Sequence, residues 1–300
     1  MNKRTGSWFL IAASAALVVL LGACGGSTNA PQTTTTTVEP STVPPPTSTA
    51  PPAPTTQPQT PPTILAPEPV SVVLVTSNDV LNVRGDPDPQ SDIVSTLAFD
   101  ATGLALTGEE QGTNSGLWKK TTSPDGWVNS FFLTGPRPDD DIIGDAVSDF
   151  AAALATGGDL RPVVDDRGLF VISFDQPKRF AGLDLAVVMD DETLYPWGSP
   201  ACSPNECPNE ATFADAVADD FLDVWADDDV ILSYNEPISA PNGTVPEHAI
   251  PDIFTNFGYV AVHDPGDDPD FDGLDWTTWY VFVDGSTNKV VGMNFDIRAP

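Results

Sequence analysis

The sequence predicts a multi-domain chain. A disordered linker precedes a small β-barrel, residues 70–136, and then an α+β domain with an antiparallel sheet, residues 140–300. Three observations lead to this fold class. Residues 24–69 consist mainly of Thr, Pro, Ser and Ala. Short apolar segments of strand length then alternate with turn residues. Beyond them, two patterns with helical spacing occur among further strand-like segments, which is typical of the α+β class.

Acidic residues dominate the charge of the chain. It has 300 residues, with 43 Asp and Glu against 12 Lys and Arg, and a formal net charge of −31. Because phosphate binding needs a basic face, this balance argues against nucleic acid as a partner.

The first 23 residues have the composition of an export signal. Two basic residues precede an apolar run, Trp8–Leu21, which is too short to span a bilayer comfortably. The run ends in Leu-Gly-Ala-Cys, residues 21–24, which resembles the lipobox of bacterial lipoproteins. The resemblance implies that a signal peptide, residues 1–23, is removed and that Cys24 carries the acyl chains. Membrane attachment through the lipid and an extracytoplasmic location follow from it. The alternative is an ordinary secretory signal with an incidental Cys.

The segment from Cys24 to residue 69 is predicted to be a disordered linker. It contains a run of five Thr, Thr33–Thr37, and a Pro run, Pro44–Pro46, and has almost no apolar residues. Such a segment cannot offset its own ordering entropy by burial. Its Pro content favours an extended stalk that reaches about 100 Å at roughly 3 Å per residue.

Short strands separated by turns are expected over residues 70–136. The apolar segments are Val72–Val75, Val80–Arg84, Ile93–Leu97, Leu104–Leu106, Leu117–Lys120 and Trp127–Asn129. The turns between them are rich in Gly, Asp, Asn and Pro. This spacing predicts a small barrel.

The motifs in these segments resemble the bacterial SH3 (SH3b) family. They are Leu-Asn-Val-Arg at 81–84, Ile-Val-Ser-Thr-Leu at 93–97, Trp118, and Asp-Gly-Trp-Val-Asn-Ser-Phe-Phe-Leu at 125–133. The match covers about 65 residues in the order of the family. The chain departs from it by Gly-Asp-Pro at 85–87 and by a longer loop at 109–116. The resemblance implies an SH3-like barrel.

The family resemblance also implies a surface module that binds cell-wall peptides or other extracellular ligands. The matching positions give Asn82, Arg84, Trp118 and Trp127 as ligand-binding candidates. Three of them have a structural alternative. Trp127 is expected to pack into the barrel, and Asn82 and Arg84 could hold the turn through bonds to the backbone. Trp118 is expected to be the exposed aromatic residue.

The remaining chain is strongly acidic and has mixed patterns. Residues 138–300 hold 33 acidic and 6 basic residues. Helical spacing occurs over 143–154 and 213–225, with Thr212 as an expected cap. Strands are expected at 169–174, 183–189, 230–234, 259–262, 276–283 and 289–295. The arrangement also resembles an accessory domain of predicted secreted bacterial lipoproteins, which implies no particular chemistry.

Few residues in this part of the chain are candidates for catalysis, metal binding or a disulfide. Cys202 and Cys207 are expected to form a disulfide that closes a small loop, because the chain is expected to be exported. His248 and His263 are expected to be bystanders, since no nucleophile stands in a recognisable setting. Catalysis is therefore not favoured.

One acidic loop has the pattern D-x-D-x-D-G. Asp268, Asp270 and Asp272 alternate as Ca²⁺ ligands do, and Gly273 follows them. The twelfth position is Trp279 and not the Glu that would complete the site. A solvated acidic loop is therefore favoured over Ca²⁺, and no other cofactor is expected.

These observations together predict non-catalytic binding at the cell envelope. The SH3b-like domain is expected to contact peptidoglycan or an associated wall polymer. Two alternatives stay open. One is an envelope enzyme whose C-terminal domain is catalytic and whose SH3b-like domain targets it. The other is a structural domain that Ca²⁺ stabilises.

Overall fold

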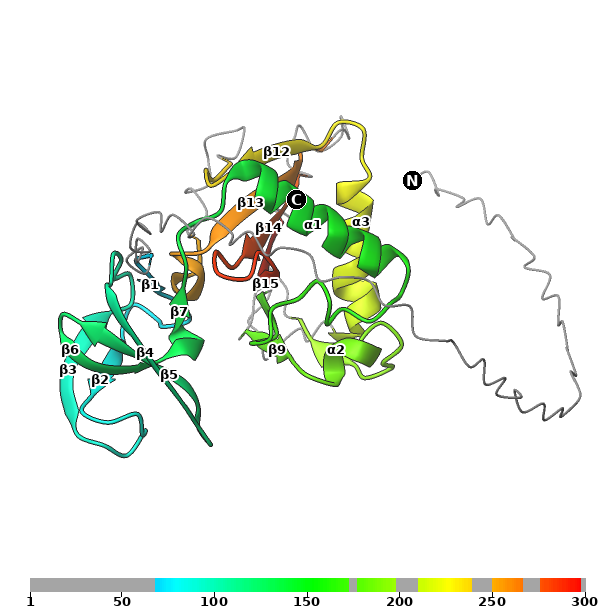
Figure 1. Ribbon diagram of the computed structural model, residues 1–300. Helices are drawn as coiled ribbons and strands as arrows, with labels where there is room; N and C mark the ends of the chain where they lie inside the picture. Colours follow the sequence, from blue (N-terminus) through cyan, green and yellow to red (C-terminus); the bar gives the residue numbers. More distant parts are fainter. Residues whose placement is uncertain (1–67, 173–176, 198–209, 239–249, 267–275, 298–300) are drawn as a thin grey trace, which may run out of the picture. The chain divides into compact units, whose positions relative to one another are not determined.

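The computed structural model describes residues 68–172, 177–197, 210–238, 250–266 and 276–297 (Figure 1). All of them belong to one compact unit. The predicted signal peptide, Cys24 and nearly all of the predicted linker lie outside the described residues. Among the described helices, none has the length and apolar character needed to cross a membrane. The fold is rich in β-structure, and most strands belong to a five-stranded or a six-stranded sheet.

Residues 68–134, the β-module, contain the five-stranded sheet, with the order β3-β2-β6-β5-β4. Its elements are β1 (Ser71–Val72), β2 (Val80–Arg84), β3 (Ile93–Ala98), β4 (Leu106–Thr113), β5 (Gly116–Thr122), β6 (Asp125–Asn129), the 3₁₀ turn η1 (Ser130–Phe132) and β7 (Leu133–Thr134). The expected barrel is not closed, because β3 and β4 lie at opposite edges and no pairing joins them among the described strands. Instead, β1 and β7 form a separate antiparallel pair.

Strand alternation decides which side chains of the β-module are buried. In β2, Leu81 and Val83 are buried and belong to the apolar core of the module. Asn82 and Arg84 point to the opposite side of the same strand, because successive side chains alternate. The two polar candidates are therefore held on one side by the core packing of their neighbours.

Residues 139–297, the C-terminal module, contain the six-stranded sheet, with the order β12-β13-β14-β15-β8-β9. Its strands are β8 (Leu169–Ile172), β9 (Lys178–Phe180), β12 (Ile231–Tyr234), β13 (Gly258–Asp264), β14 (Thr277–Val283) and β15 (Val290–Ile297). A two-residue pair, β10 (Tyr195–Pro196) and β11 (Glu210–Ala211), forms a small separate sheet. The predicted hairpin between residues 276 and 295 is confirmed as β14 and β15.

The expectation of a purely antiparallel sheet was wrong. β8 pairs with β15 in parallel, with Gly292 opposite Phe170. These two strands are separated by more than a hundred residues of chain and meet in the middle of the sheet. The direction of such a pair depends on how the chain returns to the sheet, and strand periodicity carries no information about it.

The two predicted helices are confirmed. α1 (Asp140–Ala155) buries the apolar residues that define its pattern. The second begins as a π-helical segment, η2 (Ala214–Ala218), and continues as α3 (Asp219–Trp225). The Thr212 hydroxyl accepts a hydrogen bond from the Asp215 amide (3.1 Å), as expected for a cap.

The strand expected at 183–189 was wrong. The chain forms a short helix there, α2 (Asp184–Val187), with Leu185 and Val188 buried. Buried positions three residues apart fit a helix. The periodicity of such a short apolar run, however, does not distinguish a helix from a strand.

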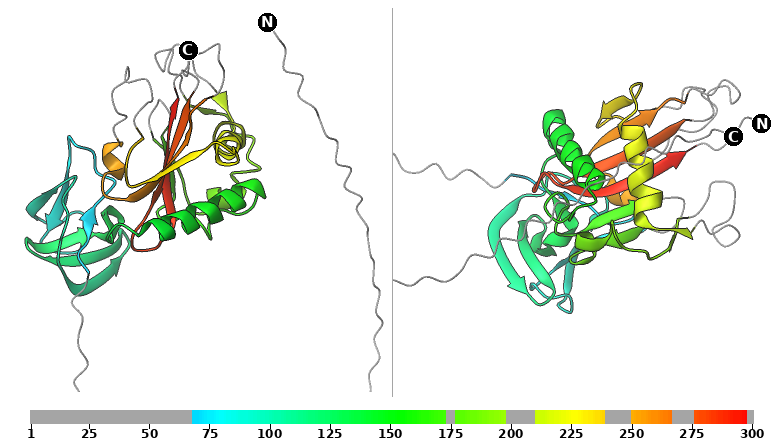
Figure 2. Two further views of the ribbon diagram at one scale, coloured as in Figure 1. Left: turned by 90° about the horizontal axis from the view of Figure 1, so that it is seen from above. Right: turned by 90° about the vertical axis from the view of Figure 1, so that its right-hand side faces the viewer.

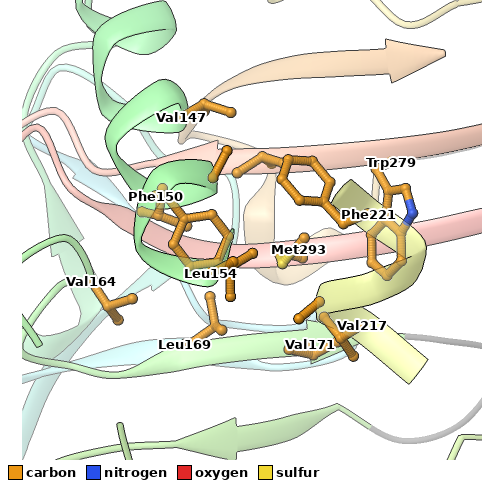
Figure 3. Packing of buried hydrophobic residues seen from close by; sticks show 14 of the residues in the cluster. Val147, Phe150, Leu154, Val164, Leu169, Val171, Val217, Phe221, Trp279 and Met293 are labelled. Atoms are coloured by element: carbon orange, nitrogen blue, oxygen red, sulfur yellow. The ribbon is translucent and has the colours of Figure 1, made fainter. Parts of the chain in front are cut away.

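The inner strands β13 and β14 of the six-stranded sheet are buried on both faces, whereas Ile231 and Leu232 of the edge strand β12 are exposed. Figure 2 shows α1 and α3 on one face, where Val260, Val262 and Trp279 lie in the main core. Phe150 and Leu154 of α1 meet Phe221 of α3 in this core (Figure 3).

The opposite face of the sheet presents Tyr259, Tyr280 and Phe282. It is covered by the segment around η3 (Asp252–Phe254) and by Val73 of the β-module. The two modules therefore share a hydrophobic cluster.

Backbone hydrogen bonds also join the modules. The Leu74 amide donates to the Ile253 carbonyl (2.9 Å), and the Asn256 side-chain amide donates to the Val72 carbonyl (2.8 Å). The Ser77 amide donates to the Asp252 carboxylate (3.0 Å). The β-module is thus fixed to the C-terminal module by both apolar and polar contacts.

Two backbone segments cross closely at the same junction. A Cβ atom on Gly285 would lie 1.8 Å from the Pro136 carbonyl oxygen, and one on Gly135 would lie 2.9 Å from the Gly285 carbonyl oxygen. Only glycine allows two backbones to approach this closely. The turn between β14 and β15 is therefore packed directly onto the connection between the modules.

Candidate functional site

A groove in the β-module brings together three of the four ligand-binding candidates. Asn82, Arg84 and Trp118 line it, and Pro89 and Phe132 contribute further surface. Its volume is about 420 Å³, which is within the range of small-ligand sites. Trp127 does not line this groove.

The two polar residues of the groove differ in how they are bonded. The Arg84 Nη1 atom donates to the Ser91 carbonyl (2.6 Å), so that Arg84 holds the turn that follows β2. Holding the turn is the structural role that the sequence analysis gave for Arg84 as the alternative to ligand binding. The half-buried Asn82 side chain makes no hydrogen bond with any described residue. Its amide is therefore available to a ligand.

The expected roles of the two tryptophans are reversed. Trp118 is only 3% exposed, and its Nε1 atom donates to the Ser115 hydroxyl (3.1 Å). Trp127 is half-buried, and the Lys120 ammonium lies 5.9 Å from its ring centroid. In β6 the buried positions are Gly126 and Val128, which places Trp127 on the other side of the strand. The apolar Val128 next to Trp127 was the signal that could have indicated this.

A second and larger cleft lies where the modules meet, and it is called the junction cleft below. Its volume is about 690 Å³. One wall consists of residues 70, 115–117, 119 and 129–133 of the β-module, and the other consists of residues 165–167, 179, 284, 286 and 287. The sequence analysis named none of these residues as a ligand-binding candidate, because their juxtaposition depends on how the modules pack.

A buried charge network forms the floor of the junction cleft. The Arg167 guanidinium is 11% exposed and binds the carboxylates of Asp165 (2.7 Å) and Asp284, whose side chains are 3% and 0% exposed. It also donates to the Leu133 carbonyl (3.0 Å) of the β-module. Thr287 donates its hydroxyl to Asp165 (2.8 Å). Arg167 therefore forms ion pairs with two buried carboxylates and a hydrogen bond with a carbonyl group of the other module.

The network shifts the pKa values of Asp165 and Arg167. Burial alone would raise the pKa of Asp165, but the hydrogen bonds and charge of Arg167 outweigh it and hold this pKa below its ordinary value. Burial would lower the pKa of Arg167, but Asp165 and Asp284 outweigh it and raise this pKa. Both groups are thus charged at neutral pH.

Several predicted site residues lie outside the described part of the chain. These are Cys24, the expected disulfide partners Cys202 and Cys207, His248, and the Ca²⁺ candidates Asp268, Asp270 and Asp272. Among the residues that the structure describes, no cluster of three or more His, Cys, Asp or Glu is suited to hold a metal ion.

His263 is buried in the six-stranded sheet, and the described cleft linings do not include it. Its Nδ1 atom lies 2.8 Å from the Thr278 hydroxyl, in a hydrogen bond between neighbouring strands. Burial lowers the pKa of His263, although the nearby Asp264 carboxylate acts in the opposite direction. The imidazole is therefore neutral in the folded protein.

We expect His263 to make the stability of the chain depend on pH. Its pKa is lower in the folded state than in the unfolded state, so the unfolded chain binds the proton first as pH falls. Stability is then lost from about pH 6.5 downward. Urea unfolding followed between pH 7.5 and pH 5 measures this loss, and His263→Gln should show a smaller loss over that interval. An equal slope in both proteins would contradict the assignment.

Comparison with protein-family models, with curated protein sequences and with solved structures finds no match for this chain. The functional argument therefore rests on the two clefts and on the sequence motifs. Of these, the groove of the β-module is the place where motif and geometry coincide.

Proposed function

We propose that this chain is a lipid-anchored protein of the bacterial cell envelope that binds cell-wall peptide or glycan without catalysis. The binding part is the β-module, interpreted as an SH3-like domain. The observation that carries the proposal is the groove that Asn82, Arg84 and Trp118 line together. The same three residues belong to the motifs that resemble the SH3b family.

The chemistry of the groove suits recognition of peptide or sugar. The Asn82 amide can donate and accept hydrogen bonds, and Arg84 contributes a guanidinium. Phe132 and Pro89 offer apolar surface, whereas Trp118 is almost fully buried beneath the groove. Among the described lining residues, Asp79 is the only carboxylic acid, and its carboxylate already accepts a bond from the Val80 amide (2.8 Å). This supports binding over acid–base catalysis.

The N-terminal segment supplies the anchor in this proposal. The lipobox-like sequence before Cys24 attaches the chain to the membrane, and the Thr- and Pro-rich linker spaces the β-module from it. The partners are then the membrane on one side and peptidoglycan or an associated polymer on the other.

Removal of the free amide in the groove should weaken wall binding. We expect Asn82→Ala to bind isolated peptidoglycan roughly 3- to 10-fold more weakly, the cost of one hydrogen bond. The measurement is the fraction of full chain, kept soluble in detergent, that sediments with peptidoglycan over a concentration series. Asn114→Ala is the matched control, because Asn114 is exposed and does not line the groove.

The outcome decides between binding and a structural role of the groove. If Asn82→Ala and Asn114→Ala both sediment like the unchanged chain, the groove is not the wall-binding site. If the unchanged chain itself stays in the supernatant, the proposed function is wrong.

A further inference from the structure

We propose that the junction cleft is a second binding site, which takes a ligand with a free carboxylate group and holds this group on Arg179. The inference goes beyond the proposed function, because it does not depend on the groove of the β-module. It rests on the bonding of Arg179, on the hydrogen bonds that already occupy the Asp165 and Asp284 carboxylates, and on the polar groups that face the cleft.

Arg179 is an exposed cation that is fixed in orientation. Its Nε atom donates to the Arg167 carbonyl (2.6 Å). Its guanidinium lies 5.3 Å from the ring centroid of Phe131 and 5.7 Å from that of Phe170. A hydrogen bond and two aromatic contacts thus hold a planar group that would otherwise sample many rotamers.

The terminal nitrogens of Arg179 are free to bind a ligand. Neither Nη atom makes a hydrogen bond or an ion pair with any described residue. A guanidinium has five N–H donors in a planar fork, and here only the Nε–H is used. This fork matches the two oxygens of a carboxylate, which it can bind in a bidentate manner.

The carboxylates that line the cleft do not compete strongly for Arg179. Asp165 and Asp284 are both bound to Arg167, and further bonds from Thr287 and from the Ser286 amide (2.7 Å) occupy their oxygens. Arg167 offsets only one of these two charges, so the floor keeps a net negative charge, but the carboxylate oxygens already have hydrogen-bond donors. The exposed Asp166 is the remaining carboxylate of the lining.

The rest of the cleft favours a singly charged organic ligand. The hydroxyls of Ser130 and Ser286 line it and make no hydrogen bond with described residues. Phe131 and the exposed Leu117 offer apolar surface to the body of a ligand.

Lys119 also lines the cleft, and its ammonium is paired with Glu110 (3.0 Å). Among the described lining residues, the unpaired charges are then the Arg179 guanidinium and the Asp166 carboxylate. Beside a floor of net negative charge, this suits a monoanion better than a dianion such as phosphate. The volume accommodates a ligand larger than a single amino acid.

Two ligand sources share this chemistry, namely the carboxyl end of a peptide and an acidic sugar. The test is calorimetric titration of the full chain in detergent with N-acetyl-D-alanyl-D-alanine, its C-terminal amide, glucuronic acid and inorganic phosphate. We expect a carboxylate to bind at least 10-fold more tightly than both the amide and phosphate. The compound that binds more tightly, the peptide or the sugar, identifies the source of the carboxylate ligand.

Variants then assign the binding to Arg179. We expect Arg179→Gln to weaken carboxylate binding by at least 10-fold and Arg179→Lys to weaken it by less, because the charge remains and the fork is lost. Arg161→Gln is the matched control, since Arg161 is exposed, pairs with Asp159 and lies outside both clefts. Thermal unfolding of each variant shows whether the fold is kept.

Three results would overturn the proposal. They are equal affinity for the acid and the amide, unchanged affinity in both Arg179 variants, or binding of phosphate as tight as that of the carboxylates. A fourth result, loss of carboxylate binding in Asn82→Ala but not in Arg179→Gln, would assign the binding to the groove and would overturn the proposal as well. If the chain does not sediment with peptidoglycan but still binds the carboxylate, only the proposed function is wrong.

Discussion

Replacing Arg167 by Gln lowers the free energy of unfolding at pH 7 by about 3–5 kcal/mol, the usual cost of removing one partner from a buried ion pair. The variant leaves Asp165 and Asp284 as two buried carboxylates without a cation, and it removes a bond to the Leu133 carbonyl of the β-module. Urea unfolding followed by Trp fluorescence measures the change. Arg161→Gln, which breaks an exposed pair, should change stability far less.

The pH dependence of the Arg167→Gln variant gives an independent check. Without the cation, nothing from Arg167 outweighs burial, which raises the pKa of Asp165 in the folded state. The folded variant then binds protons more readily than the unfolded chain, so it gains stability as pH falls from 7 toward about 4. The unchanged protein has a lowered pKa at Asp165 and gains nothing from that group over this interval. The stability gap should therefore narrow, and a constant gap would mean that the carboxylates are not the cause.

Replacing Gly285 by Ala should destabilise the chain by about 3 kcal/mol, at the upper end of the cost of overpacking. The new methyl group would lie 1.8 Å from the Pro136 carbonyl oxygen, and backbone cannot move aside as a flexible side chain can. The matched control is Gly112→Ala, because a Cβ atom there meets no atom within 4 Å. The control should change stability by no more than about 0.5 kcal/mol.

The site of the Gly285→Ala effect can be tested by limited proteolysis. The substitution separates the turn between β14 and β15 from the connection between the modules, so cleavage near residues 135–139 should become faster. Equal cleavage rates and equal stability in Gly285→Ala and Gly112→Ala would show that the close crossing is not needed.

Local patterns predicted the elements of this fold better than their arrangement. The apolar spacing from Ile143 to Leu154 predicted the buried face of α1. The hairpin of β14 and β15 followed from two apolar runs around a turn. In both cases the information lies within a few residues, where periodicity and turn chemistry operate.

The sequence patterns did not predict the arrangement of the strands where it depends on contacts between segments that lie far apart in the chain. The parallel pairing of β8 with β15 and the open five-stranded sheet depend on how the chain returns after long connections. At the candidate site, the motif gave Asn82 and Arg84 as candidates, and the alternation of β2 places both on the same side of the strand. The junction cleft joins Phe131, Arg167, Arg179 and Asp284 from separate elements, and no local pattern relates them.

The segment from Val70 to Ser77 connects the N-terminal part of the chain to both modules. Val70 pairs with Leu104, and Leu74 and Ser77 are bonded to Ile253 and Asp252. Leu74 also lines the groove that contains Asn82. In a chain tethered to a membrane by its N-terminus, this segment is the first to carry mechanical load, and it shares that load between the two modules. Under the proposed function, the wall of the groove and the load-bearing end of the tether are the same piece of backbone, and pulling on the tether would then act on the wall of the ligand site.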